Sequence, residues 1–135
     1  MVDKPRNGGE WTESRFNGFI VSALRAASQR WGPKNQCIRD ARVSRGLYKC
    51  DGCGNIVPAT LPPPEGKKNR IKNIVADHIN PVVDPAVGFV DWGTYIARMF
   101  VERDGYQALC HECHTKKSAE ERRIAKERRS TNNEK

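Results

Sequence analysis

The sequence lacks any long apolar stretch. No run among its 135 residues reaches the length that a membrane-spanning helix requires, and the opening residues, Met1 to Arg6, have no apolar segment of the kind found in a secretory signal. We therefore expect a protein that does not enter membranes and that stays in the cytoplasm, where thiols are reduced.

Apolar residues and acidic charge are also scarce. Only 37% of the residues are apolar and 7% aromatic, against 30% charged, which predicts one domain with a small core. Lysine and arginine exceed aspartate and glutamate by a net charge of +8, and they are spread along the whole chain. A polyanion is the expected partner, and nucleic acid is favoured over a membrane because no stretch sets a wide apolar face opposite its basic residues. Basicity alone fits a solvated surface equally well.

Cysteine is rare too, but four of the five cysteines form two Cys-x-x-Cys pairs, Cys50/Cys53 and Cys110/Cys113. Two thiolates from each of two such pairs are the ligand set of a closed, tetrahedral structural zinc site. Redox or disulfide use is the alternative, and it fits a reducing compartment less well. The remaining cysteine, Cys37, is expected to be a buried core thiol.

Local patterns predict a short series of helices and strands. Apolar residues at steps of three and four predict a helix over residues 11–31, a second one through Cys37 and Val43, and a third over residues 92–100. Strands are expected over residues 74–79 and 106–109, and a charged helix from His114 onward. Residues 61–66 are expected to be a loop, and those beyond about Lys126 a flexible tail. No internal repeat is present besides the paired cysteines.

The order of these motifs resembles the HNH endonucleases, in particular the small zinc-clipped type common in bacteriophages. The resemblance rests on three segments: Cys50-x-x-Cys53, Val75-Ala76-Asp77-His78-Ile79-x-Pro81, and Leu109-Cys110-x-x-Cys113-His114-x-x-Lys117. It covers about residues 48–119. It implies an α+β fold with a ββα-metal core: two antiparallel strands and a helix around one catalytic divalent ion, with the zinc joining the strand and helix ends.

Phosphodiester hydrolysis requires a base near neutral pKa and a cation to neutralise growing negative charge. His78 is the candidate base, and Asp77 is a carboxylate able to hold Mg²⁺ or Mn²⁺. The resemblance implies that His114 is the second ligand of that ion and that Lys117 contacts substrate phosphate. Because neighbouring residues of a strand point to opposite faces, Asp77 and His78 converge only if the strand bends.

Each of these residues also has an ordinary structural interpretation. Taken singly, Asp77 is typical of a surface or capping carboxylate, His78 of a packed imidazole, and His111 or His114 of a zinc ligand. The family usually has an asparagine shortly before the second cysteine pair, which is thought to brace the loop between the two strands. This chain has none there, so Asp104 or Gln107 is expected to take that role. His111 is interpreted as a side chain that lies behind the metal ligands or faces DNA.

These features predict a metal-dependent DNA endonuclease of the HNH type, encoded by a phage and located in the host cytoplasm. We expect an N-terminal helical extension over residues 1–46, a nuclease core over 47–125 and a basic tail over 126–135. Six basic residues are the expected phosphate contacts: Lys67, Lys68, Arg70, Lys117, Arg122 and Arg123. A homodimer or a packaging partner is compatible with the sequence. The rival hypothesis is a non-catalytic zinc module that binds nucleic acid or assists packaging.

Overall fold

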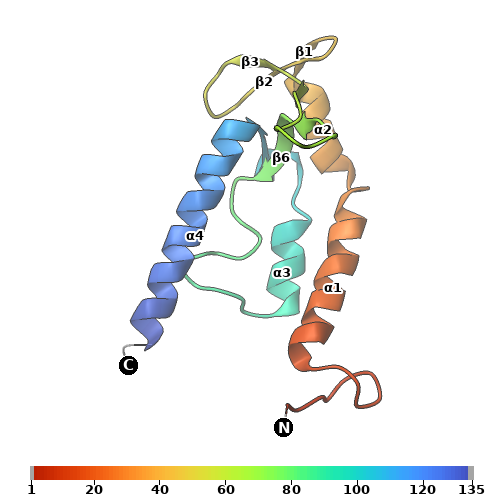
Figure 1. Cartoon of the computed structure of the whole chain (residues 1–135), viewed down its shortest axis with the longest axis vertical. Helices are drawn as coiled ribbons and strands as arrows, with labels where there is room; N and C mark the ends of the chain where they lie inside the picture. Colours follow the sequence, from red (N-terminus) through yellow and green to blue (C-terminus); the bar gives the residue numbers. More distant parts are fainter. Residues whose placement is uncertain (1, 134–135) are drawn as a thin grey trace. The chain divides into compact units, whose positions relative to one another are not determined.

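The computed structural model describes residues 2–133, which form α-helices and small antiparallel sheets, so the fold class is α+β (Figure 1). The chain divides into two compact units, Met1–Trp31 and Gly32–Lys135. Helix α2, Gly32–Ala41, packs on strands of the second unit and belongs to it. The boundary at residue 46 between a helical extension and a nuclease core stays a prediction. Among the described residues, no helix has both the length and the apolar character needed to cross a membrane.

The first unit consists of helix α1, Glu13–Ser28, and the turn that precedes it. The Thr12 hydroxyl accepts the backbone N–H of Arg15 at 3.1 Å, which satisfies one of the free donors of the first helical turn. Arg6 binds Glu13 and lies over the Phe16 ring, with 4.3 Å to its centroid. The helix predicted over residues 11–31 is confirmed.

The second unit begins with α2 and a three-stranded antiparallel sheet in the order β1-β2-β3, formed by Arg42–Ser44, Leu47–Lys49 and Ile56–Pro58. Helix α2 is shorter than predicted, because Val43 already belongs to β1. Its Cys37 is fully buried, which confirms a core thiol, and burial raises the pKa of that thiol.

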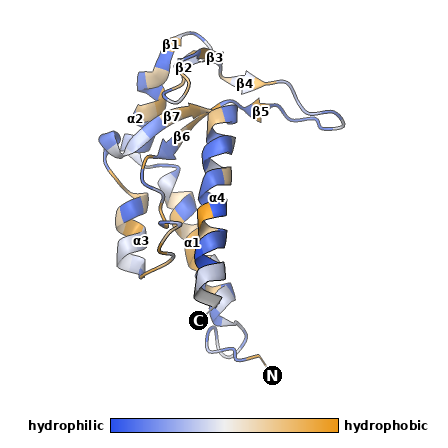
Figure 2. Ribbon diagram, turned by 90° about the vertical axis from the view of Figure 1, so that its left-hand side faces the viewer, coloured by the Kyte–Doolittle hydropathy of each residue, from blue (hydrophilic) through white to orange (hydrophobic). Residues whose placement is uncertain are grey.

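Strands β4, Thr60–Leu61, and β5, Ile71–Lys72, pair into a hairpin whose tip extends away from strands β6 and β7 (Figure 2). The tip contains Pro62, Pro63 and Pro64, which cannot continue a ladder, so the loop begins at Pro62. Leu61, the expected first residue of the loop, belongs to β4. Arg70 closes the base of the hairpin, with its Nε donating to the Thr60 hydroxyl at 2.8 Å.

Strands β6, Ile74–His78, and β7, Tyr106–Cys110, form a two-stranded antiparallel sheet, and helix α4, His111–Asn133, follows β7 without a connecting residue. The register pairs Ile74 with Cys110 and continues evenly to the pair of His78 and Tyr106. Both predicted strands are present. Helix α4 starts three residues before the predicted start.

Helix α4 also continues past Lys126, where a flexible tail was expected, through the last described residues. Ion pairs one turn apart support it, since Arg123 contacts both Glu120 and Glu127. Arg128 donates to the Pro85 carbonyl at 3.2 Å, so this part of the helix also has a tertiary contact. Residues 134 and 135 of the predicted tail lie outside the described residues.

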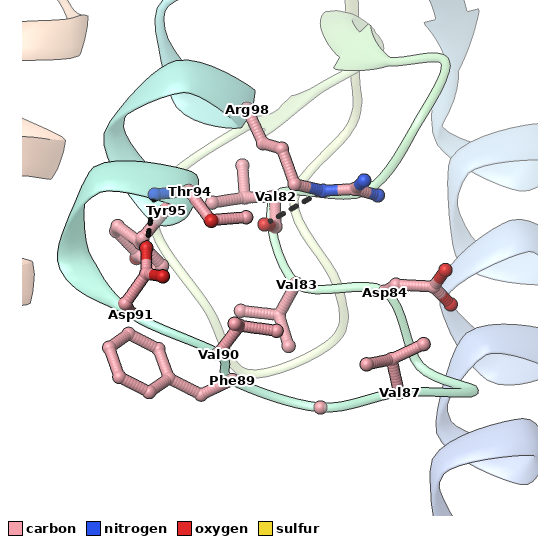
Figure 3. Close-up of a pocket in the computed structure, with 11 residues that line it drawn as sticks. Val82, Val83, Asp84, Val87, Phe89, Val90, Asp91, Thr94, Tyr95 and Arg98 are labelled. Carbon is pink, nitrogen blue, oxygen red and sulfur yellow. Dashed lines mark hydrogen bonds between the residues drawn. The ribbon is translucent and has the colours of Figure 1, made fainter.

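The connection between β6 and β7 contains helix α3, Trp92–Met99, and a short 3₁₀ turn, Arg103–Gly105. The Asp91 carboxylate caps α3, and Arg98 donates to the Pro81 carbonyl at 2.7 Å, which ties the two ends of the loop together. Valines, Phe89 and Tyr95 line a cavity of about 120 Å³ between the loop and the helix (Figure 3). The third predicted helix is therefore confirmed, with Tyr95 and Met99 buried.

Candidate functional site

Four cysteines meet where the first Cys-x-x-Cys turn lies against the junction of β7 and α4. The sulfur atoms of Cys50, Cys53, Cys110 and Cys113 all lie within 4.8 Å of one another. Cys50 and Cys110 are buried, whereas Cys53 is exposed. Four sulfurs at this spacing can reach one tetrahedral zinc ion, which confirms that the two pairs form a single candidate metal site.

The first cysteine turn is shaped to present sulfur to a cation. The Cys50 sulfur accepts backbone N–H groups from Gly52 at 3.3 Å and from Cys110 at 3.2 Å. Gly52 lies in tight surroundings, because a Cβ there would lie 3.1 Å from both the Cys113 sulfur and a Leu109 methyl carbon, which would have to shift slightly. The Asp51 carboxylate accepts the Ala108 N–H at 2.8 Å and joins the turn to β7.

The ionisation of the four thiols favours a bound cation. Burial acts to raise the pKa of Cys50, but backbone N–H groups that include those of Cys110 and Gly52 outweigh it and lower the pKa to about 6. Burial and the neighbouring sulfurs raise the pKa of Cys113 to about 12. Four thiolates at such short range repel one another, so a divalent cation is the natural means of ionising all of them.

A second group of polar side chains surrounds Asp77, one residue before the end of β6. Its Oδ1 lies 3.8 Å from Nε2 of His114, which projects from the first turn of α4. Its Oδ2 accepts a hydrogen bond at 3.1 Å from Nε2 of Gln107, the residue that pairs with Asp77 on β7. The Asp77 side chain is only 12% exposed, whereas that of His114 is 43% exposed. The carboxylate is therefore held in place, and the imidazole is open to solvent.

The distance between Asp77 and His114 fits a small divalent ion. Two ligand atoms at about 2.1 Å from one octahedral ion lie about 3 Å apart in adjacent positions, so closing a gap of 3.8 Å needs only a slight side-chain rotation. One carboxylate and one imidazole leave the remaining positions to water and substrate, as Mg²⁺ or Mn²⁺ prefers.

Lys117 lies at the centre of this group. Its Nζ is 2.9 Å from Asp77 Oδ2, 2.9 Å from the His78 carbonyl oxygen and 2.7 Å from Glu121 Oε1. An ammonium group has three N–H donors, and these three acceptors use all of them. Burial lowers the pKa of Lys117, but the hydrogen bonds that its ammonium donates to Glu121 and Asp77 outweigh burial and raise the pKa overall. Contact with phosphate would require Lys117 to release one of its three acceptors.

His78 faces the other side of the two-stranded sheet. Its ring lies 4.8 Å from that of Tyr106, its partner on β7, and its Nε2 is 2.8 Å from the Met99 carbonyl oxygen. A carbonyl only accepts, so Nε2 carries the proton and Nδ1 holds the lone pair in the neutral ring. The register stays regular through His78, so the bend that would turn it toward Asp77 within the strand is not seen.

The remaining predicted residues are dispersed. Lys67, Lys68 and Arg70 are exposed on the β4–β5 hairpin, and Arg122 and Arg123 are exposed on α4. Two of these cations already have partners, since Arg70 binds Thr60 and Arg123 binds two glutamates. Asp104 and Gln107 were the residues expected to replace the family's asparagine. Of these, Gln107 contacts Asp77 directly.

Sequence reasoning missed Asn73, which is 5% exposed and lies just before β6. Its backbone N–H donates to Ala59 at 2.9 Å, its Nδ2 donates to the Pro58 carbonyl at 2.9 Å, and its Oδ1 accepts the His111 N–H at 3.1 Å. The only signal in the sequence is an asparagine inside a β-rich run, where its type is disfavoured.

Comparison with family models, with curated proteins and with solved structures gives no match to this chain.

Proposed function

We propose that the protein is a metal-dependent endonuclease of the HNH type that hydrolyses DNA phosphodiester bonds. The observation that carries the proposal is the proximity of Asp77 Oδ1 and His114 Nε2, 3.8 Å apart at the junction of β6, β7 and α4. These elements supply two antiparallel strands and a helix in the order that a ββα-metal core requires, with the four-cysteine site at the start of the helix.

Asp77 and His114 would hold one Mg²⁺ or Mn²⁺, which supplies electrostatic stabilisation of the charge that grows on the phosphate and leaving oxygen. Gln107 and Lys117 fix Asp77 Oδ2 and leave Oδ1 toward His114. The zinc-binding cysteines fix the backbone just before His114. Preorganisation of this kind is worth most in a site with only two protein ligands.

His78 is the proposed general base. The hydrogen bond from Nε2 to the Met99 carbonyl orients the ring and leaves the Nδ1 lone pair to accept a proton from water. Asp77 and His78 lie on opposite faces near the end of β6, so the proposal requires one phosphate to reach both side chains around that end.

The basic residues would position DNA through its phosphates without reading bases. Lys67 and Lys68 lie on the projecting hairpin, and Arg122 lies on α4. The ionic attraction supplies sequence-independent affinity, so the proposed enzyme has modest sequence preference.

A specific observation favours a second candidate, a non-catalytic zinc module that binds nucleic acid or a packaging partner. Lys117 gives Asp77 a counter-charge within the protein, and His78 points away from Asp77. Both features are compatible with a structural role for Asp77 and His78.

Cleavage of supercoiled plasmid separates the two candidates. The zinc-loaded protein is incubated with plasmid and Mn²⁺ or Mg²⁺ beside His78→Ala and His114→Ala. The control is Glu112→Ala, a more exposed residue of the same helix that pairs with Lys116. We expect nicking or linearisation by the wild type and Glu112→Ala, with a loss of at least about 100-fold in the histidine variants. Equal activity in all four proteins, or activity in none of them while DNA binding persists, would support the binding module.

A further inference from the structure

Lys117 and Glu121 extend the Asp77 group by one turn along α4, and neither belongs to the proposed ligand set. Residues 114, 117 and 121 follow one another at steps of three and four, so they share one face of the helix. The Lys117 ammonium bridges the two carboxylates, at 2.9 Å from Asp77 and 2.7 Å from Glu121. The side chains of Asp77, Lys117 and Glu121 are 12%, 25% and 31% exposed, so water screens their charges only in part.

The arrangement divides the two oxygens of Asp77 between two kinds of cation. Oδ2 accepts Lys117, while Oδ1 faces His114. A divalent ion held by Oδ1 and His114 would share the Asp77 carboxylate with the Lys117 ammonium, and repulsion between the two positive charges would lower the affinity for the ion. Glu121 opposes this repulsion, because its carboxylate contacts the same ammonium.

We propose that Lys117 and Glu121 are positioning residues that form a charge pair setting the affinity of the Asp77–His114 site for divalent ions. Lys117 orients Asp77 and lowers the affinity, and Glu121 offsets the lysine charge and raises it. The inference rests on the metal site of the proposed function, but not on DNA cleavage. The affinity of the site for a divalent ion should then depend on the net charge of Asp77, Lys117 and Glu121. With two carboxylates and one ammonium, this group carries one net negative charge.

The charge pair predicts opposite effects for two neighbouring substitutions. Lys117→Met leaves two negative charges and is expected to tighten Mn²⁺ binding about tenfold, since Gln107 still holds Asp77 Oδ2. Glu121→Gln leaves the group neutral and is expected to weaken binding about fivefold. The double variant restores one net negative charge and is expected to return the affinity to within about twofold of the wild type. Lys117→Arg keeps the charge and serves as the matched control.

Mn²⁺ binding to the zinc-loaded full chain is measured by titration with detection of free Mn²⁺ by electron paramagnetic resonance, without DNA. Asp77→Asn defines binding at other positions, and circular dichroism with zinc content verifies that each variant is folded. Opposite shifts in the single variants and recovery in the double variant support the proposal.

Weaker binding in both single variants, with the double variant weakest, would show a purely structural role and overturn it. Changes below about twofold, or no Mn²⁺ binding that depends on Asp77, would overturn it too. The expected shifts without plasmid cleavage would leave this inference standing and reject the nuclease.

Discussion

Asn73 fixes the first residue of helix α4, because its side-chain oxygen accepts the backbone N–H of His111 at 3.1 Å. The same side chain donates to the Pro58 carbonyl, so one buried amide joins the end of β3 to the start of α4. Since β6 begins at the next residue, Asn73 also sets the position of the strand that carries Asp77 against the helix that carries His114.

Substitution of Asn73 by alanine should therefore destabilise the second unit. Loss of the side chain removes two partly buried hydrogen bonds and the packing of a residue that is only 5% exposed, at a cost of about 1 to 3 kcal/mol in the free energy of unfolding. Urea denaturation followed by circular dichroism measures it. Asn55→Ala, an exposed asparagine in the same unit, should cost far less; equal costs for both would contradict the role assigned to Asn73.

Zinc should be required for folding of the second unit. We expect one zinc ion per chain, and removal by a strong chelator should unfold the unit cooperatively, since the binding free energy of a structural zinc is part of the folding free energy. Metal analysis and thermal melting by circular dichroism test this. Cys53→Ser should lose the ion, whereas Cys37→Ala should retain it, because Cys37 lies outside the cluster. A chain without zinc that melts as the loaded protein does would refute the prediction.

A methyl group at Gly52 should strain the cysteine turn. A Cβ would lie 3.1 Å from the Cys113 sulfur and from a Leu109 methyl carbon, so Gly52→Ala should shift the cysteine turn and lower zinc affinity at least about tenfold. Competition with a chromogenic zinc chelator gives the affinity. Gly18→Ala, in the interior of α1 with nothing within 4 Å of its Cβ, should leave zinc binding unchanged. Similar affinities for the two variants would show that the turn has room to adjust.

Stability in acid should depend on Asp40. Arg103 Nε donates to this carboxylate at 2.9 Å, and that hydrogen bond, followed by one from Gln36, lowers the pKa of Asp40. A lowered folded pKa contributes stability that is fully present above the unfolded pKa of about 3.9 and is lost as the pH falls through the folded value. Melting temperatures measured from pH 6 to pH 2 should fall less steeply for Asp40→Asn. Arg103→Gln should flatten the profile in the same way, and unchanged slopes would exclude this pair as a source of acid sensitivity.

Lys67 and Lys68 should contribute to DNA affinity without affecting the fold. Both are exposed at the tip of the hairpin. Replacing them with alanine should weaken binding to a short duplex and reduce the slope of log affinity against log salt by up to about 1.8 if each neutralises one phosphate. Fluorescence anisotropy at several salt concentrations measures the slope. Arg123→Ala should have a smaller effect, because two glutamates already bind that guanidinium; a larger effect for Arg123 would place the DNA on α4.

The sequence predicted the features that depend on local spacing. The meeting of the two Cys-x-x-Cys pairs in one cluster follows from ligand chemistry, although the first pair lies in a turn and the second at the start of α4. The periodicity of residues 92–100 predicted α3. The approach of Asp77 and His114 was expected only from the family resemblance, and the structure brings them within 3.8 Å.

The features that sequence reasoning missed depend on partners far along the chain. Asn73 bonds to residues 15 and 38 positions away, and Lys117 reaches Asp77 from the following helix. The His78 side chain is held by Met99, which lies in the long connection between the paired strands. Charge and hydrogen-bonding capacity are readable from residue type, but the choice of partner is decided by tertiary packing.

The pairing of Asp51 with Ala108 has a consequence for solubility. The backbone N–H of Asp51 donates to the Ala108 carbonyl at 2.7 Å, and the Asp51 carboxylate accepts the Ala108 N–H at 2.8 Å, on the side of β7 that β6 does not cover. An open strand border is a template onto which another chain can add and start a fibril. In this protein the cysteine turn covers the free edge of β7 at Ala108. Loss of the metal would uncover the unpaired backbone groups of that edge as well as loosen the fold. The metal-free protein should therefore be prone to aggregate.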